Sequence, residues 1–228
     1  MLDNRYKTNL LYKDEETLDD LIKKLDHQHP IQRKLQFFLD IRGILKTNFI
    51  KGSYVEYGCF KGETIFACEK ILEETMVMDN YYGIDLFSNE ELNLSSSDLE
   101  SNQFDSKHPF LFESFDEIKE AFKNKNKINF IKGDLNDKNT FKQLKINEIN
   151  VALIDCNFLS SLESSIIHAL DNICDFGFLF IDDYFTNLKK SGLVVDTILR
   201  REIKNRNYKL VDYKIYAPFA KSFMILKK

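Results

Sequence analysis

Five short apolar runs, each followed by a stretch with helical periodicity, constrain the fold of this chain more than any other feature. The runs occupy residues 53–58, 81–87, 128–134, 150–157 and 177–183. Nearly continuous apolar strands that alternate with helices are typical of a parallel sheet covered on both faces. Two final strand-like runs within residues 208–228 have no helix between them, which predicts an antiparallel hairpin at one edge. The sequence therefore predicts one α/β domain.

Two segments lie outside this alternation. Residues 15–28 and 30–49 carry apolar residues at helical spacing ahead of the first strand, and we expect an N-terminal helical cap over residues 1–50. The main domain is then residues 51–228. Residues 88–112 are polar and interrupt the crossover between the second and third strands. A long insertion of this kind is either a lid over a site or a surface loop.

Composition and charge exclude several classes of protein. The 228 residues are 43% hydrophobic with a net charge of −4, which gives no electrostatic reason to expect a nucleic-acid partner. No run approaches the roughly 20 apolar residues of a membrane span, and the polar N-terminus lacks the apolar core of a signal peptide. We therefore expect a cytoplasmic protein without a membrane partner. None of the four cysteines pair at C-x-x-C spacing, which predicts reduced, packed thiols.

Carboxylates stand at the end of every predicted parallel strand. In open parallel sheets, ligands bind beyond the carboxyl ends of the strands. A single Asp there is usually a turn residue or a helix cap, but five acidic strand ends on one edge indicate a ligand site. The residues are Glu56, Asp85, Asp134, Asp155 and the pair Asp182–Asp183.

The turn after the first strand has the pattern E-x-G-x-x-x-G, formed by Glu56, Gly58 and Gly62. This spacing is not the G-x-G-x-x-G of dinucleotide-binding folds, so a nicotinamide dehydrogenase is disfavoured. A carboxylate at the turn would repel a phosphate and would favour an ammonium group. Asp85 is suited to a ribose diol and Asp134 to an adenine amino group. S-adenosylmethionine combines an amino acid, a ribose and an adenine without phosphate.

The motifs "VEYGCFKGET", "GIDLF", "FIKGDLND" and "IDCN" follow one another in the order seen in class I S-adenosylmethionine-dependent methyltransferases, and the chain resembles that class over residues 50–185. The resemblance implies a Rossmann-like, seven-stranded, mostly parallel sheet whose last strand is antiparallel, with helices on both faces. The helix that Thr64 opens could help to hold the methionine carboxylate. The expected cofactor-binding residues are Glu56, Gly58, Gly62, Thr64, Asp85, Asp134, Leu135 and Asp155.

A narrower similarity, carried by "GCFKGET", "IDCNFLSS" and "GFLFIDDYF", is to the macrocin O-methyltransferase family. It implies methylation of sugar or polyketide hydroxyls with a divalent metal, Mg or Mn, held by Asp155, Asp182 and Asp183. Strands about 4.8 Å apart can bring three carboxylates together, and a hard cation would relieve their repulsion. Both members of the Asp pair can ligate only if the strand ends there. The alternative is that Asp183 caps a turn and Asp182 is solvated.

The chain departs from the family pattern at one catalytic position. The family commonly has D-x-D after the fourth strand, whereas this chain has Asp155-Cys156-Asn157. An Asn cannot take a proton, although it can hydrogen-bond a substrate. We expect Asp155 and Asn157 in the catalytic site, with His108 of the insertion as replacement base; His27 and His29 are weaker alternatives. A metal that acidifies the acceptor hydroxyl could serve instead.

The sequence thus predicts an S-adenosylmethionine-dependent O-methyltransferase acting on a small-molecule acceptor, which we expect to be glycosyl. A homodimer is a further expectation. Two alternatives stay open. One is a catechol-type metal-dependent methyltransferase. The other is a partner subunit that binds the donor but has lost its own catalysis, and Asn157 in place of the family's second acid is the feature that leaves this alternative open. The basic run at 200–206 is expected to be a solvated helix face.

Overall fold

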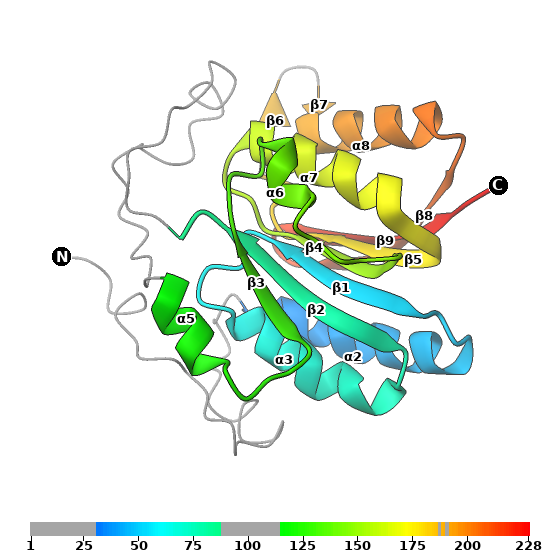
Figure 1. Cartoon of the computed structure of the whole chain (residues 1–228). Coiled ribbons are helices and arrows are strands. Elements are labelled where there is room, and N and C mark those ends of the chain that lie inside the picture. The colour runs from blue at the N-terminus through cyan, green and yellow to red at the C-terminus, as the bar shows by residue number, and fades with distance from the viewer. Residues whose placement is uncertain (1–30, 88–114, 187, 190–191) are drawn as a thin grey trace.

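The computed structural model describes residues 31–87, 115–186, 188–189 and 192–228. A seven-stranded sheet runs through the middle of the molecule, with helices above and below it (Figure 1). The order of its strands is β3-β2-β1-β4-β5-β9-β8. They are β1 (Gly52–Tyr57), β2 (Met78–Asp85), β3 (Ile128–Lys132), β4 (Ile149–Ile154), β5 (Ile173–Ile181), β8 (Lys209–Tyr216) and β9 (Ala220–Leu226).

Strand direction confirms the predicted fold. The pairs β1–β2, β1–β4, β2–β3 and β4–β5 are parallel. The last strand, β9, lies antiparallel to both β5 and β8, so the predicted terminal hairpin closes the sheet. Every residue of the central strands β1 and β4 is buried, which explains their continuous apolar pattern. The edge strand β8 is largely exposed.

Helices cover both faces of the sheet (Figure 1). One apolar cluster joins one face to α2, α3 and α5, and a second joins the opposite face to α7 and α8. The helix that follows β3 ends already at Phe141, because i→i+3 hydrogen bonds from Gln143 and Leu144 tighten the chain there. The helices are α2 (Ile31–Thr47), α3 (Glu63–Leu72), η2 (Glu73–Thr75), α5 (Phe115–Ala121), α6 (Lys138–Phe141), α7 (Leu159–Asn172) and α8 (Val194–Asn205). A separate two-stranded antiparallel sheet consists of β6 (Leu188–Lys189) and β7 (Gly192–Leu193).

The helix α2 falls within the expected N-terminal cap and is one of the helices that cover the sheet. Its side chain Phe37 is fully buried, with its ring centroid 4.8 Å from that of Phe180 and 6.0 Å from that of Tyr216. Burial of one such ring contributes about 2 kcal/mol. The apolar stripe of α2 therefore fixes the helix, and with it the residues of its first turn, against the sheet. The first expected cap helix and the insertion at 88–112 lie outside the described residues.

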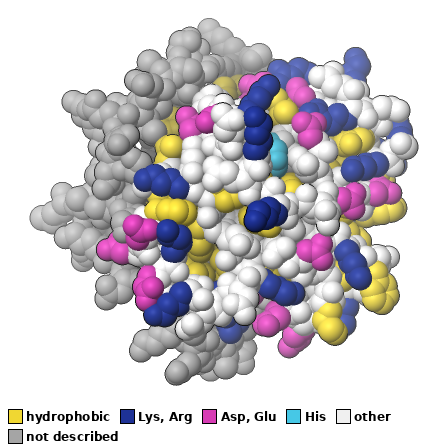
Figure 2. All heavy atoms as spheres, in the orientation of Figure 1, with side chains coloured by type: hydrophobic (Ala, Val, Ile, Leu, Met, Phe, Trp, Pro, Cys, Tyr) yellow, Lys and Arg dark blue, Asp and Glu magenta, His cyan; other side chains and the backbone are white. Residues whose placement is uncertain are grey.

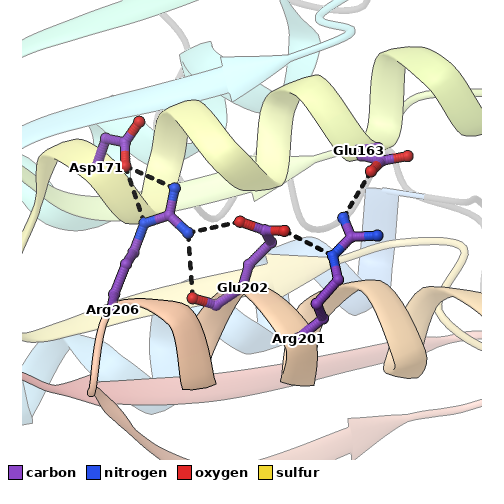
Figure 3. Close-up of polar contacts among 5 residues, drawn as sticks. All are labelled: Glu163, Asp171, Arg201, Glu202 and Arg206. Carbon is purple, nitrogen blue, oxygen red and sulfur yellow. Dashed lines mark hydrogen bonds and ion pairs between the residues drawn. The ribbon is translucent and has the colours of Figure 1, made fainter.

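Five charged residues form a network between α7 and α8, which we call the α7–α8 clasp (Figure 3). Arg206 donates to Asp171 and to Glu202, and Arg201 donates to Glu163 and to Glu202. The arginines belong to the basic run at 200–206. The basic side chains of this run are largely exposed, as expected of a solvated face, but Glu202 between them is 8% exposed and both arginines also bridge to the neighbouring helix.

The distribution of surface charge and the state of the cysteines match what the composition of the chain predicts. Figure 2 shows Lys and Arg side chains interspersed with Asp and Glu over the described part of one face. Within the described ranges, no helix is both long enough and apolar enough to cross a membrane. All four cysteines are free and buried, as the sequence predicts.

Candidate active site

The glycine turn joins β1 to α3, and its two glycines are required by geometry. Gly58 has φ +82°, and a Cβ atom there would lie 2.2 Å from the carbonyl oxygen of Asp155. Gly62 has φ +78°, and its Cβ would lie 2.7 Å from the ring of Phe130. A side chain at either position would be both strained and blocked. The turn therefore brings the end of β1 directly against the end of β4.

Strand periodicity places the strand-end acids on one face. Tyr54 of β1, Leu153 of β4 and Phe180 of β5 all belong to the cluster beneath α2 and α3. Side chains two residues apart on a strand share a face. Glu56, Asp155 and Asp182 follow these three positions, so they meet at the carboxyl ends of the strands on the α2 side. We call this group, with Asp85 and Asp183, the acidic rim.

Glu56 is the most deeply buried acid of the rim, with 1% of its surface exposed. The Tyr54 hydroxyl donates to its Oε2 at 2.9 Å, and the Thr64 hydroxyl also hydrogen-bonds to it. Burial raises the pKa of Glu56 to about 8, although the charge of Lys34 and the two hydroxyl bonds oppose the rise. A cationic ligand group that reached this carboxyl would find an acceptor already held in place.

Asp85 ends β2 and organises the loop beside Glu56. Its carboxylate accepts from the amide of Phe60 at 2.8 Å and from the amide of Leu86 at 2.7 Å. The second bond turns the chain, which is why β2 ends at Asp85 and not at Phe87 as the run at 81–87 suggested. Burial raises the pKa of Asp85, and these amide bonds oppose the rise. Asp85 thus joins the first two loops of the rim.

Asp134 follows β3, the outermost of the parallel strands. It is exposed, two residues beyond the end of β3, and its Oδ1 accepts from the amide of Asn136 at 2.8 Å. The next residue, Leu135, is buried in the cluster beneath α7 and α8. The side chain of Asn136 donates to Ser160 and Ser161 of α7 and fixes this loop. A ligand that contacts both Asp134 and Glu56 has to extend along the strand ends.

Two cations of α2 hold the acids that follow β4 and β5. Arg33 donates a hydrogen bond to each carboxylate oxygen of Asp182, from Nε to Oδ1 at 2.5 Å and from Nη2 to Oδ2 at 2.6 Å. Lys34 donates to Oδ2 of Asp155, and its Nζ lies 3.9 Å from Oδ2 of Asp182. Burial alone would lower the pKa of Lys34, but Asp155, Asp182 and Glu56 outweigh it and raise that pKa. The first turn of α2 therefore completes the site.

The remaining expected residues are placed around this centre. Because β5 ends at Ile181, Asp182 and Asp183 both follow the strand, as the metal interpretation required. Asp183 is half-buried, and burial together with Asp155 and Asp182 raises its pKa to about 7. Asn157 is half-buried in the loop between β4 and α7. His108, the expected replacement base, lies outside the described residues, as do His27 and His29.

The arrangement does not fit a divalent metal as the resemblance implied. Among the described residues, no group of three or more His, Cys, Asp or Glu side chains is arranged to hold a metal ion. Arg33 uses both oxygens of Asp182, and Lys34 uses one oxygen of Asp155. Two unit charges 4 Å apart repel by about 4 kcal/mol at an effective dielectric constant of 20, and a dication doubles this. A metal on Asp155 and Asp182 would have to displace these cations.

The sequence analysis did not identify Arg33 and Lys34 as site residues, although the position of Lys34 in its helix could have indicated a role there. The buried positions of α2 include Ile31, Leu35 and Phe38, and Lys34 falls in the same stripe with 5% of its surface exposed. A lysine is almost never fully buried without a partner. Lys34 therefore implied an acid nearby, whereas Arg33 carried no comparable signal.

The sheet order, the glycine turn and the acidic rim together define a class I S-adenosylmethionine-dependent methyltransferase. The sequence model of the macrocin-O-methyltransferase (TylF) family matches residues 27–212, which is more than half of the chain. The chain belongs to this family of O-methyltransferases. The matched range includes α2 and therefore both Arg33 and Lys34. A search of curated proteins finds no match.

Solved structures show the same fold at low sequence identity. The O-methyltransferase NovP matches with a TM-score of 0.65 and 15% identity over 86% of this chain and 80% of its own. The calicheamicin methyltransferase CalS11 matches with a TM-score of 0.64 and 11% identity over 91% of this chain and 83% of its own. The methyltransferase PaMTH1 of Podospora anserina, solved with S-adenosylhomocysteine, has a TM-score of 0.51 and 12% identity over 97% of this chain and 99% of its own.

Proposed function

We propose that this chain transfers the methyl group of S-adenosylmethionine to a hydroxyl of a sugar or of a sugar-containing small molecule. The observation that carries the proposal is the buried Glu56, held by Tyr54 and Thr64 at the glycine turn, with Asp85 beside it. Glu56 binds the ammonium group of the donor, Asp85 the ribose diol, and Asp134 the adenine. The family supports a hydroxyl acceptor.

The reaction is an in-line displacement. A lone pair of the acceptor oxygen forms the new C–O bond while the S–C bond breaks, and its electron pair returns to sulfur as S-adenosylhomocysteine. The hydroxyl proton passes to a general base, for which His108 stays the candidate because Asn157 cannot take a proton. The work of the protein is to hold donor and acceptor in line, which can supply several kcal/mol of the barrier lowering.

The magnesium or manganese ion that the resemblance implies at Asp155, Asp182 and Asp183 stays an untested prediction. We leave it out of the proposed reaction because Arg33 and Lys34 already neutralise two of the three acids. A cytoplasmic location and a homodimer likewise stay predictions.

Donor binding is the first test. Calorimetry of the full chain with S-adenosylmethionine should show one site, and Glu56→Gln should weaken it roughly tenfold or more, because a neutral amide replaces the carboxylate that would pair with the donor's ammonium group. The matched control is Glu163→Gln in the α7–α8 clasp, which should bind the donor normally. Equal binding by wild type and Glu56→Gln would contradict the assigned role, and no donor binding by wild type would contradict the proposal.

Acceptor class is the second test. Transfer of a labelled methyl group should be detected with glycosides or nucleotide sugars and not with catechols. The reverse preference would favour a catechol-type enzyme. Asn157 favours one further candidate, a donor-binding subunit without turnover of its own. That candidate would be supported if the chain binds the donor but methylates no acceptor until a second protein is added.

A further inference from the structure

The basic pair Arg33–Lys34 is the part of the site that the expected chemistry does not use. The pair stands in the first turn of α2, and its partners Asp155 and Asp182 stand where β4 and β5 end. Lys34 lies between the two strand ends, in contact with Asp155 and 3.9 Å from Asp182. Three separate parts of the chain therefore meet through one ammonium group and one guanidinium group.

We propose that Arg33 and Lys34 take the place of the divalent metal in this site, so that the chain binds its donor and turns over without a metal ion. The inference rests on the proposed function, since it concerns the same site. It assigns Arg33 and Lys34 as positioning residues. They pair with the acids that follow β4 and β5 and hold them in fixed positions, as a metal would, but with covalently anchored charges.

The inventory of oxygen atoms supports this assignment. Magnesium and manganese need direct oxygen ligands, and carboxylates are the main ones that proteins supply. Arg33 occupies both oxygens of Asp182 in the fork geometry that guanidinium groups favour. Lys34 occupies one oxygen of Asp155. Of the six carboxylate oxygens in the expected triad, three are thus already engaged by cations.

The burial of the cations supports it as well. The side chain of Lys34 is 7% exposed and that of Asp182 is 5% exposed. An ammonium group this buried is stable only while its acidic partners stay beside it. Apolar neighbours Leu35 and Phe38 anchor the same turn of α2 in the core. Moving Lys34 aside for a metal would require this turn to shift or the lysine to lose its charge.

Charge balance gives the third support. Asp155, Asp182 and Asp183 carry three negative charges when all three are ionised, as metal ligands would be, and the basic pair supplies two positive charges. A dication with the same three acids would leave the same net charge of about one negative unit. Adding a dication to the site with the pair in place would instead give a net positive centre. Such a centre would oppose the positively charged sulfonium donor.

The test measures binding of Mn²⁺ alone to the full chain, by electron paramagnetic resonance, beside calorimetry with S-adenosylmethionine. Wild type should bind the donor equally with and without EDTA and should show no one-to-one Mn²⁺ site at micromolar metal. A one-to-one micromolar site in wild type that Asp182→Asn removes would overturn the inference. Donor binding in that case would leave the proposed function intact, whereas absent donor binding would count against the proposed function itself.

A matched set of variants tests the role of the lysine. Lys34→Met keeps the length of the side chain but frees Asp155 and removes a positive charge, so Mn²⁺ should bind at least about tenfold more tightly than to wild type. Lys34→Arg keeps the positive charge and should not tighten Mn²⁺ binding. Arg201→Met removes a clasp cation far from the site and should also leave Mn²⁺ binding unchanged. If Lys34→Met folds, as circular dichroism would show, and binds Mn²⁺ no better than wild type, the inference is wrong.

Discussion

The acidic rim and the α7–α8 clasp pair the same kinds of side chain in two different environments. In the rim, the side chains of the pair Lys34–Asp182 are 7% and 5% exposed. In the clasp, those of the pair Arg201–Glu163 are 49% and 38% exposed. Figure 3 shows the clasp spanning two neighbouring helices, whereas the rim pairs join α2 to the ends of two core strands.

The difference teaches that contact geometry alone does not set the importance of an ion pair. Both networks have hydrogen bonds near 2.6 Å. Exposed pairs gain little because water and salt screen them, with typical contributions of about 0–1 kcal/mol. A buried pair adds little over apolar packing, but removal of one partner leaves a buried charge uncompensated. The rim should therefore be intolerant of change and the clasp tolerant, and this contrast can be tested.

The largest expected effect is that of Asp182→Ala. The variant leaves Arg33, whose side chain is 18% exposed, without the buried carboxylate that it pairs with, and breaking a buried pair costs up to about 3–5 kcal/mol. Urea unfolding of the full chain measures the loss. The control is Asp171→Ala in the clasp, where Arg206 keeps Glu202 as a partner. Equal losses in the two variants would contradict the contrast drawn between rim and clasp.

Gly58→Ala should have the second largest effect, because the backbone of the turn after β1 packs directly against the backbone after β4. The new methyl group would meet the carbonyl oxygen of Asp155 at a left-handed φ, and we expect a loss of about 3 kcal/mol and of donor binding. Gly43 supplies the matched control. It is exposed in the middle of α2 with nothing within 4 Å of its Cβ position, so Gly43→Ala should stabilise the protein by about 1 kcal/mol. A neutral Gly58→Ala would show that the turn can open.

Two glutamates should give opposite responses to pH. Burial raises the pKa of Glu56 from 4.5 to about 8, so between these values the folded protein holds a proton that the unfolded chain has lost. The free energy of unfolding should therefore fall as pH rises from 4.5 to 8, and Glu56→Gln should remove this part of the fall. Hydrogen bonds from Arg206 and Arg201 lower the pKa of Glu202 against the effect of burial. Its contribution is present above pH 4.5 and is lost as pH falls through the lowered value.

The measurement is urea unfolding of wild type, Glu56→Gln and Glu202→Gln across pH 3–8. Glu56→Gln should change the neutral part of the profile and Glu202→Gln only the acid part. Identical profiles for wild type and Glu56→Gln would mean that Glu56 is ionised in the folded protein at neutral pH. The charge of Lys34 and the hydrogen bonds from Tyr54 and Thr64 would then affect the pKa of Glu56 more than burial does.

Periodicity and spacing predicted the sheet and the residues that end its strands. The apolar runs located the parallel strands, and the hairpin followed from the absence of a helix between the last two runs. The exact last residue of each strand was harder to predict, because local hydrogen bonds decide where a strand ends. Asp85 ends β2 by accepting from Leu86, which no apolar pattern records. The positions of Glu56 and Asp85 were predictable from the sequence for the same reason that the fold was.

The partners of those acids were not predictable in the same way. Arg33 lies 149 positions from Asp182 along the chain, and only the packing of α2 on the sheet brings them together. The basic run at 200–206 posed the same problem, since its pairing with α7 depends on how two helices lie side by side. Single-sequence reasoning places side chains on an element, but contacts between elements depend on tertiary packing. The expected metal was inferred from three acids whose cations were still unknown.

The smallest effect should be that of Arg201→Met, which removes one arm of the clasp. Its partner Glu163 remains exposed to water, so we expect a loss below about 1 kcal/mol at physiological salt. A double-mutant cycle with Glu163→Gln should give a coupling of a few tenths of a kcal/mol that fades at about 1 M salt, where the Debye length is near 3 Å. The corresponding cycle between Arg33 and Asp182 should give a larger coupling that salt changes less, because the two side chains are only 18% and 5% exposed. If salt weakens both couplings alike, burial does not distinguish the two networks, and the basic pair of α2 is a surface feature and not a fixed part of the methyltransferase site.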